Sequence, residues 1–294
     1  MRTQMLMLSL LTATLALPAV ADKPYRDMTD YLDYGKRPKA SDDAKHTNTY
    51  QYWKDNAKID PARANHLVDF WTVNWKYRDA PYNDTLHGGH EAQDRGEALF
   101  KQLNANGDFA KCMGAKNNNL KGLRMNYPQF NKEMGRVIGM EAMIEHCAGK
   151  QGMKLENGSY DNTSVSMYIT GFSNGMPMKL DVSKGPLKDS FEHGKELFHM
   201  KAGWTNFSCA TCHVSNVGKN LRGQTPTTHY GDAAHWPVWR SKDELQSLHI
   251  RFTECNRNAG VQPLKVGSQE YTDIEVFMTA LSNGYPVVSP ATRD

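Results

Sequence analysis

The sequence lacks the charge bias that marks many nucleic-acid-binding proteins. Of its 294 residues, 35 are Lys or Arg and 32 are Asp or Glu, so the formal net charge is only +3. A protein that binds nucleic acid through its phosphates usually carries a basic excess, and this chain has neither that excess nor an acidic tail. We therefore predict no nucleic-acid partner.

Long hydrophobic runs are absent beyond the N-terminus. After the first 21 residues no segment reaches the ~18 consecutive apolar residues of a membrane-spanning helix. The first residues differ, because Arg2 precedes an apolar run from Met5 to Leu17 and then Ala19-Val20-Ala21, a typical signal-peptidase site. The sequence thus predicts a signal peptide over 1–21, cleavage after Ala21, export to the periplasm and no membrane span.

Cysteine is scarce, and its odd number excludes a simple disulfide framework. The five cysteines are Cys112, Cys147, Cys209, Cys212 and Cys255. Cys209-Ala210-Thr211-Cys212-His213 has the C-x-x-C-H spacing of c-type haem attachment, in which both thiols bond to the haem and the His ligates its iron. A zinc site would need a second ligand pair, and a thioredoxin-like site would need a βαβ context. The pattern favours haem c, attached through Cys209 and Cys212 with His213 as an axial ligand.

Two stretches of the chain repeat each other at a separation of about a hundred residues. Gly96-Glu97-Ala98-Leu99-Phe100 matches Gly194-Lys195-Glu196-Leu197-Phe198, and Ser173-Asn174-Gly175 matches Ser282-Asn283-Gly284. A repeat of this length indicates two domains rather than a solenoid. We predict an N-terminal lead over 22–44 and domains over 45–180 and 181–294.

The first copy lacks the haem-attachment residues of the second. Cys112-Met113-Gly114-Ala115-Lys116 stands where the C-x-x-C-H motif stands later, so Ala115 replaces a thiol and Lys116 replaces the axial His. The first domain should therefore hold no haem. Its two cysteines, Cys112 and Cys147, would face each other in an oxidising compartment, and we predict a disulfide between them.

A second periodic pattern precedes the last cysteine of each copy. Leu245, Leu248, Phe252 and Cys255 follow a helical spacing, as do Val137, Met140, Ile144 and Cys147, and the capping-box residues Ser241 to Glu244 predict where the later helix begins. Cys255 could therefore reach the haem iron as the distal ligand. Met is the commoner distal ligand, and Met178, Met200 and Met278 are alternatives, so spacing alone does not choose between Cys and Met.

Arg251 lies one helical turn before Cys255, and the corresponding residue of the first copy is Met143. An Arg that is present only where the haem motif is present suggests a role at that site, although a solvated surface Arg is the common alternative.

These residues together resemble the SoxA family, the larger subunits of the SoxAX cytochromes of sulfur oxidation. The resemblance covers about residues 45 to 290 and rests on the C-x-x-C-H motif and on Arg251-Phe252-Thr253-Glu254-Cys255-Asn256-Arg257. Many members carry two haems; the sequence Cys112 to Lys116 departs from them and resembles the single-haem branch.

The resemblance implies a function and partners. Members couple thiosulfate to a Cys thiol of the carrier protein SoxYZ, with a small cytochrome, SoxX, as the second subunit and acceptor of electrons. It implies that Cys255 is both a haem ligand and a catalytic persulfide, and that Arg251 binds thiosulfate. Two other functions stay open: an electron-transfer cytochrome c with His/Met ligation, and a thiosulfate dehydrogenase.

Both the residue patterns and the family resemblance predict a mostly α-helical fold. Cytochrome c domains are small helical units with long irregular connections, and haem completes their core. We predict two such domains related by internal duplication, with one covalently bound haem c in the second.

Overall fold

The structure, a computed structural model, describes residues 87–216, 226, 229, 231–240, 244–284 and 287–293. The predicted signal peptide, the N-terminal lead and the start of the predicted first domain lie outside the described residues. Below, the first half means described residues up to 180, and the second half means those from 181 onward.

The first half is mainly helical. Its elements are α4 (Gly88–Leu103), α5 (Asp108–Cys112), η3 (Leu123–Asn126), β1 (Gln129–Asn131), β2 (Arg136–Ile138), α6 (Met140–Lys150) and α7 (Tyr160–Gly171). Strands β1 and β2 form an antiparallel hairpin. The start of α7 is set by Ser159, whose hydroxyl accepts a hydrogen bond from the Asn162 amide at 3.3 Å.

The second half follows a similar order. It comprises α8 (Gly185–His199), η4 (Thr211–Ser215), η5 (Asp232–His235), β3 (Val238–Arg240), β4 (Glu244–Gln246), α9 (Leu248–Asn258), α10 (Gln269–Leu281) and β5 (Ala291–Arg293). β3 pairs antiparallel with β4 and parallel with β5. The expectation of a mostly helical fold is confirmed, and the five short strands were not predicted.

Each half is organised around two helices that cross at close range. In the first half α4 packs against α7, and in the second α8 packs against α10. A Cβ at Gly96 would collide with the Ser164 carbonyl, and a Cβ at Gly194 with the Asp273 carbonyl. Both glycines therefore allow direct contact between a helix and the backbone of its partner.

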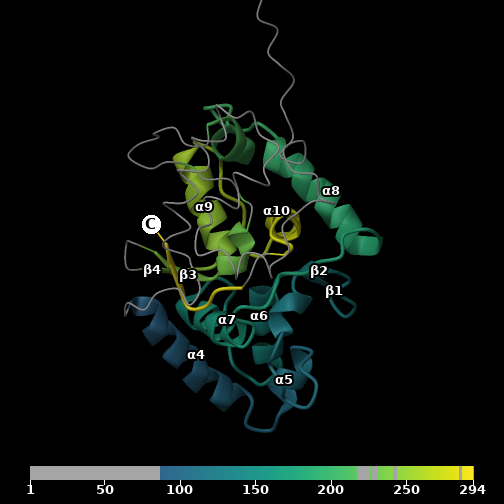
Figure 1. Cartoon of the computed structure of the whole chain (residues 1–294), viewed down its shortest axis with the longest axis vertical. Helices are drawn as coiled ribbons and strands as arrows, with labels where there is room; N and C mark the ends of the chain where they lie inside the picture. The colour runs from purple at the N-terminus through teal and green to yellow at the C-terminus, as the bar shows by residue number, and fades with distance from the viewer. Residues whose placement is uncertain are drawn as a thin grey trace, which may run out of the picture.

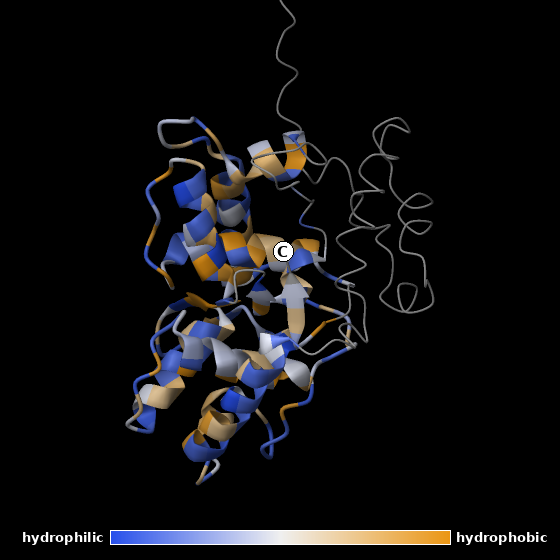
Figure 2. Ribbon diagram, turned by 90° about the vertical axis from the view of Figure 1, so that its left-hand side faces the viewer, coloured by the Kyte–Doolittle hydropathy of each residue, from blue (hydrophilic) through white to orange (hydrophobic). Residues whose placement is uncertain are grey.

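The two halves pack through their hairpins, in a reciprocal way. Strands β1 and β2 contact α8 of the second half, while β3 and β4 contact α4 of the first, and Figure 1 places the two hairpins on opposite sides of the molecule. Hydrophilic and hydrophobic residues both occur along the helices in Figure 2, whereas α10 is buried over nearly its whole length. Among the described residues, no helix has the length and apolar character needed to span a bilayer.

The sequence pattern that places Cys147 and Cys255 on helices is correct for most of its length but wrong at its start. Val137 lies on β2 and Leu245 on β4, so the first position of each pattern belongs to a strand. Helix α9 begins only after Ser247, whose hydroxyl accepts from the Ile250 amide at 3.4 Å. The strands form because each pairs with its neighbour in a hairpin, which a local periodicity does not report.

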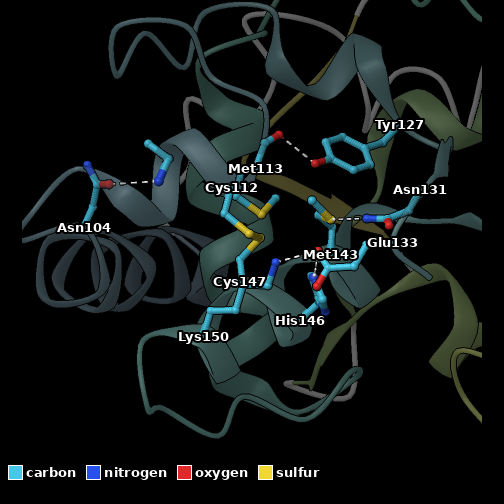
Figure 3. The surroundings of a disulfide bond; sticks show 11 residues. Asn104, Cys112, Met113, Tyr127, Asn131, Glu133, Met143, His146, Cys147 and Lys150 are labelled. Atoms are coloured by element: carbon cyan, nitrogen blue, oxygen red, sulfur yellow. Dashed lines mark hydrogen bonds and ion pairs between the residues drawn. A yellow bond between two sulfur atoms is a disulfide. The ribbon is translucent and has the colours of Figure 1, made fainter.

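A disulfide joins α5 to α6 in the first half. Cys112 and Cys147, the pair that the sequence predicts, have an S–S distance of 2.06 Å. Around them in Figure 3, the Tyr127 hydroxyl donates to the Met113 carbonyl at 2.8 Å, and Asn131 donates to the Met143 sulfur at 3.2 Å. Met113 and Tyr127 are both completely buried. Side chains and the disulfide thus fill the space beside α6.

A group of buried charged residues lies where the halves meet. Arg124 donates to the carbonyls of Tyr127 and Ala233 at 3.0 and 3.3 Å, which ties the first half to the second. The His249 Nε2 atom lies 3.1 Å from a Glu275 carboxylate oxygen, and both side chains are buried. Because the Gly267 amide donates to His249 Nδ1 at 3.0 Å, the neutral ring carries its proton on Nε2, which lies near Glu275 without forming a hydrogen bond to it.

Glu141 belongs to the same group and is held in its neutral form more strongly than an ordinary Glu. Its carboxyl accepts from the Ser166 hydroxyl at 2.8 Å. Burial, and next the negative charge of Glu275, raise the pKa of Glu141, while Arg124 acts in the opposite direction. Glu141 therefore keeps its proton to a higher pH than an ordinary Glu does.

Removal of the disulfide should destabilise the protein. The bond spans 35 residues, and closing a loop of that size in the unfolded chain corresponds to roughly 3–4 kcal/mol. We expect the Cys112→Ala/Cys147→Ala variant to unfold at lower denaturant concentration, and alkylation of the unreduced parent to leave both cysteines unlabelled. Labelling of both in the folded parent would contradict the bond.

Glu141→Gln should stabilise the protein in a pH-dependent manner. A raised folded-state pKa contributes stability that is fully present below the ordinary value of 4.5 and is lost as the pH rises through the folded value. The melting temperature of the variant should therefore equal that of the parent near pH 4.5 and exceed it at pH 8. The increase should be about 2–4 °C for each kcal/mol gained in the free energy of unfolding.

The control is Glu133→Gln, at an exposed carboxylate whose pKa is lowered by hydrogen bonds from Lys150 and His146. Its stability contribution has the opposite pH dependence, so this variant should gain nothing at pH 8. An equal rise in melting temperature at pH 8 for both variants would contradict the role assigned to Glu141.

Candidate haem attachment site

The C-x-x-C-H segment lies in a tightly hydrogen-bonded turn. Ser208 and Thr211 bond to each other, since the Ser208 amide donates to the Thr211 hydroxyl at 3.0 Å and the Thr211 amide to the Ser208 hydroxyl at 3.1 Å. A single π-helical turn, η4, then runs from Thr211 to Ser215, and π turns often occur at functional sites. Ala210, between the cysteines, is completely buried.

The two attachment cysteines are free thiols in the structure, and Cys255 is the third. Burial raises the pKa of Cys209 to about 12, and the charge of Cys255 adds to this effect. Burial and then Cys255 raise the pKa of Cys212 as well. Cys255 on α9 therefore lies within electrostatic reach of both thiols that the motif provides, as the helical pattern predicts.

Arg251 is also near Cys255. Burial alone would lower its pKa, but the negative charges of Cys255 and then Glu254 produce a net rise. Its Nη1 atom forms a 2.6 Å ion pair with the Glu254 carboxylate, and each side chain is 20% exposed. The structure thus brings together Arg251, Cys255 and the attachment motif, with one face of α9 providing the first two.

His213 packs against a histidine that the sequence did not single out. The ring centroids of His213 and His229 lie 3.9 Å apart. His229 is buried and pairs with the buried carboxylate of Asp232 at 2.8 Å. The only sequence signal for this pair is the i, i+3 spacing of His229 and Asp232, which is common on protein surfaces.

The three methionines considered as distal ligands lie in different environments. Met178 and Met278 are buried in the core of the second half, together with Phe198 and Trp236. Met200 is 50% exposed. Cys255, the remaining candidate, lies near enough to both attachment cysteines for its charge to raise their pKa values.

The residues of the second half fit a covalently bound haem. Two thiols at attachment spacing, an adjacent imidazole and a further thiol form a suitable donor set. The indole Nε1 of Trp236, in the same core as Ala210, is buried without an acceptor. Such a donor is costly to bury unpaired, and a polar group of a cofactor would satisfy it. The corresponding Tyr127 of the first half already donates to Met113.

Comparison with known proteins identifies the family of this fold. The family model described as SoxA/TsdA, cytochrome c domain, matches residues 95–178 and 193–287. The L-cysteine S-thiosulfotransferase subunit SoxA of Chlorobaculum thiosulfatiphilum is 36% identical over 202 residues, which are 68% of this chain and 70% of the relative. SoxA of Allochromatium vinosum is 26% identical over 293 residues, 96% of this chain and 94% of that one.

A solved structure gives the same result for the fold. The crystal structure of SoxXA from P. pantotrophus superposes with a TM-score of 0.65 at 25% sequence identity, and the match covers 76% of this chain and 86% of that chain. The family model accounts for a segment of each half, with the C-x-x-C-H motif inside the second. The chain belongs to the SoxA/TsdA cytochrome c family, a family that the sequence motifs predicted and whose domain implies haem c.

Proposed function

We propose that the chain is a SoxA-type L-cysteine S-thiosulfotransferase subunit, which couples thiosulfate oxidatively to a Cys thiol of the carrier protein SoxYZ. The observation that carries this proposal is the position of Arg251 and Cys255, one turn apart on α9, with Cys255 near enough to the attachment cysteines for its charge to act on them. The names of the relatives, L-cysteine S-thiosulfotransferase subunits SoxA, support the activity.

In this proposal the second half would hold one haem c. Cys209 and Cys212 would attach it, and His213 and Cys255 would ligate its iron. When bound, the haem supplies a redox-active iron with one imidazole and one sulfur ligand. The first half holds none, because its two cysteines are bonded to each other and Met113 is buried beside them. The matching order of elements and the two glycine-mediated crossings support an internal duplication, with domains over 45–180 and 181–294.

Arg251 binds thiosulfate. Its planar guanidinium presents several N–H donors and matches the oxygens of a sulfonate group. Glu254 restrains the side chain through Nη1, so that less conformational freedom is lost when the anion binds. The sulfane sulfur of thiosulfate is thereby held close to Cys255.

Cys255 acts as a persulfide. Its terminal sulfur and the sulfane sulfur of thiosulfate form a new S–S bond, and two electrons leave. The carrier thiol then attacks the former sulfane sulfur, which breaks that bond, regenerates the persulfide and releases one proton. The net change is one carrier thiol and one thiosulfate converted to a carrier S-thiosulfonate, one proton and two electrons.

The electrons pass to a second subunit. The related crystal structure is a SoxXA complex, which supports a heterodimer with a small SoxX-type cytochrome. A sulfur ligand that donates strongly lowers the reduction potential of its iron relative to His/Met ligation, so the small subunit is the better outlet. Export by the signal peptide over 1–21 places the protein in the periplasm.

Cys255→Ala should abolish turnover while keeping the haem. We expect no carrier S-thiosulfonate above the level without enzyme. The intact mass of the mature parent should equal residues 22–294 plus one haem and one sulfur, less the two hydrogens of the disulfide. The variant should lose the added sulfur and keep the haem mass. Undiminished activity would favour an electron-transfer cytochrome with Met278 as ligand, and two haems would contradict the haemless first half.

Arg251→Ala should weaken thiosulfate use without a large change in the haem absorption spectrum. Charge-assisted hydrogen bonds contribute about 1.5–3 kcal/mol, so kcat/KM for thiosulfate should fall about 10- to 100-fold. Arg251→Lys keeps the charge but loses the planar fork, so its kcat/KM should lie between those of the parent and Arg251→Ala. Arg95→Ala, at an exposed ion pair of the first half, is the control. A large spectral change with Arg251→Ala would make Arg251 structural instead.

A further inference from the structure

The most exposed large hydrophobic side chain lies beside the end of the helix that carries Cys255. Trp204 is 83% exposed, the highest value among the large hydrophobic residues of the described chain. Met200, 50% exposed, and Leu264, 40% exposed, belong to the same two segments, 200–207 and 256–265. Most of this side chain is left uncovered by the described residues, so its remaining surface is available for burial against a partner.

The two segments are joined by several backbone contacts. The Trp204 amide donates to the Gly260 carbonyl at 3.3 Å, and the Thr205 hydroxyl donates to the Ala259 carbonyl. The Ala259 amide in turn donates to the Cys255 carbonyl at 2.9 Å. The segment that carries Trp204 is therefore attached directly to the last turn of α9, one turn beyond Cys255.

Two glycines hold the indole in place. Gly203 has a φ of +68°, and a Cβ there would collide with the Gly260 carbonyl. Gly260 has a φ of +66°, and a Cβ there would collide with the Trp204 indole ring, so the ring lies over this glycine. The exposed ring thus already contacts Gly260 in the free chain, and a contact made in advance lowers the entropic cost of association.

The charge of the same segments has one sign. Segments 200–207 and 256–265 contain Lys201, Arg257 and Lys265, all exposed, and no Asp or Glu. An apolar centre with an Arg/Lys rim suits a partner with acidic residues around an apolar contact. We call the surface formed by Met200, Lys201, Trp204, Arg257, Leu264 and Lys265 the Trp204 surface.

We propose that the Trp204 surface docks the thiol-bearing carrier polypeptide, through an apolar contact on that protein with acidic residues around it. The proposal rests on the proposed function, in which a second thiol must reach Cys255 from another protein. The surface lies one turn beyond that cysteine, its charge complements acidic residues, and an exposed Trp is the residue type most often found at binding hot spots. A docked carrier would present its thiol at the end of α9.

The first test is direct binding of purified SoxYZ to the intact heterodimer, by calorimetry. Trp204→Ala should raise the Kd at least 10-fold, as loss of a hot spot does. Lys201→Glu/Lys265→Glu should also raise the Kd and reduce its dependence on salt. Phe172→Ala, which truncates a 45% exposed aromatic residue of the first half, should leave the Kd unchanged. Each variant must show the parent haem spectrum.

The second test uses steady-state kinetics. Trp204→Ala should raise KM for the carrier at least 10-fold. It should leave two other quantities unchanged: kcat at saturating carrier, and KM for thiosulfate. An unchanged Kd for the carrier, or release of the small cytochrome subunit by Trp204→Ala on gel filtration, overturns the proposal. A parent complex that binds the carrier through Trp204 but forms no S-thiosulfonate would refute the proposed function and keep the docking site.

Discussion

The close crossing of two helices is the constraint on which both halves depend. Gly96 and Gly194 each lie against a carbonyl of the partner helix, at Ser164 and Asp273, where any side chain would collide. Since α4 and α8 precede the cysteine segments and α7 and α10 follow α6 and α9, the crossing fixes where each cysteine-bearing segment lies. The reciprocal contacts of the hairpins then hold the two halves together, because each hairpin packs on helices of the other half.

The same framework surrounds two different interiors. In the first half, Tyr127 donates to the carbonyl of Met113 and the cysteines are bonded to each other, so protein groups satisfy the space beside α6. In the second half, Ala210 is small, three thiols are free and the Trp236 indole has no acceptor. The second half, with an unpaired buried donor and free thiols, has an interior suited to a cofactor. In the first half, the protein's own side chains fill the corresponding space and pair the corresponding groups.

Local sequence patterns predicted part of this arrangement. The spacing of Cys255 and Arg251 placed both on one helix face, because a helix of fixed period determines which residues are neighbours. The start of that helix was misplaced, since strand pairing of β4 depends on a partner strand. The junction of Arg124, Glu141, Glu275 and His249 was also missed, because its members come from both halves and only the fold brings them together. His229 was unassigned for the same reason, as its contact with His213 crosses a long connection.

In the proposed function, helix α9 would separate recognition of two substrates that differ in chemistry. Arg251 precedes Cys255 by four residues, about 6 Å along the helix axis, and Gly260, under the Trp204 ring, follows it by five, just beyond the end of α9 at Asn258. A small dianion needs a charged, planar donor, whereas a polypeptide needs a fixed apolar surface with a charged rim. If both were bound at one end of the helix, each would block access of the other to the sulfur. Placing them on opposite sides of Cys255 lets thiosulfate and the carrier thiol approach the same atom in turn.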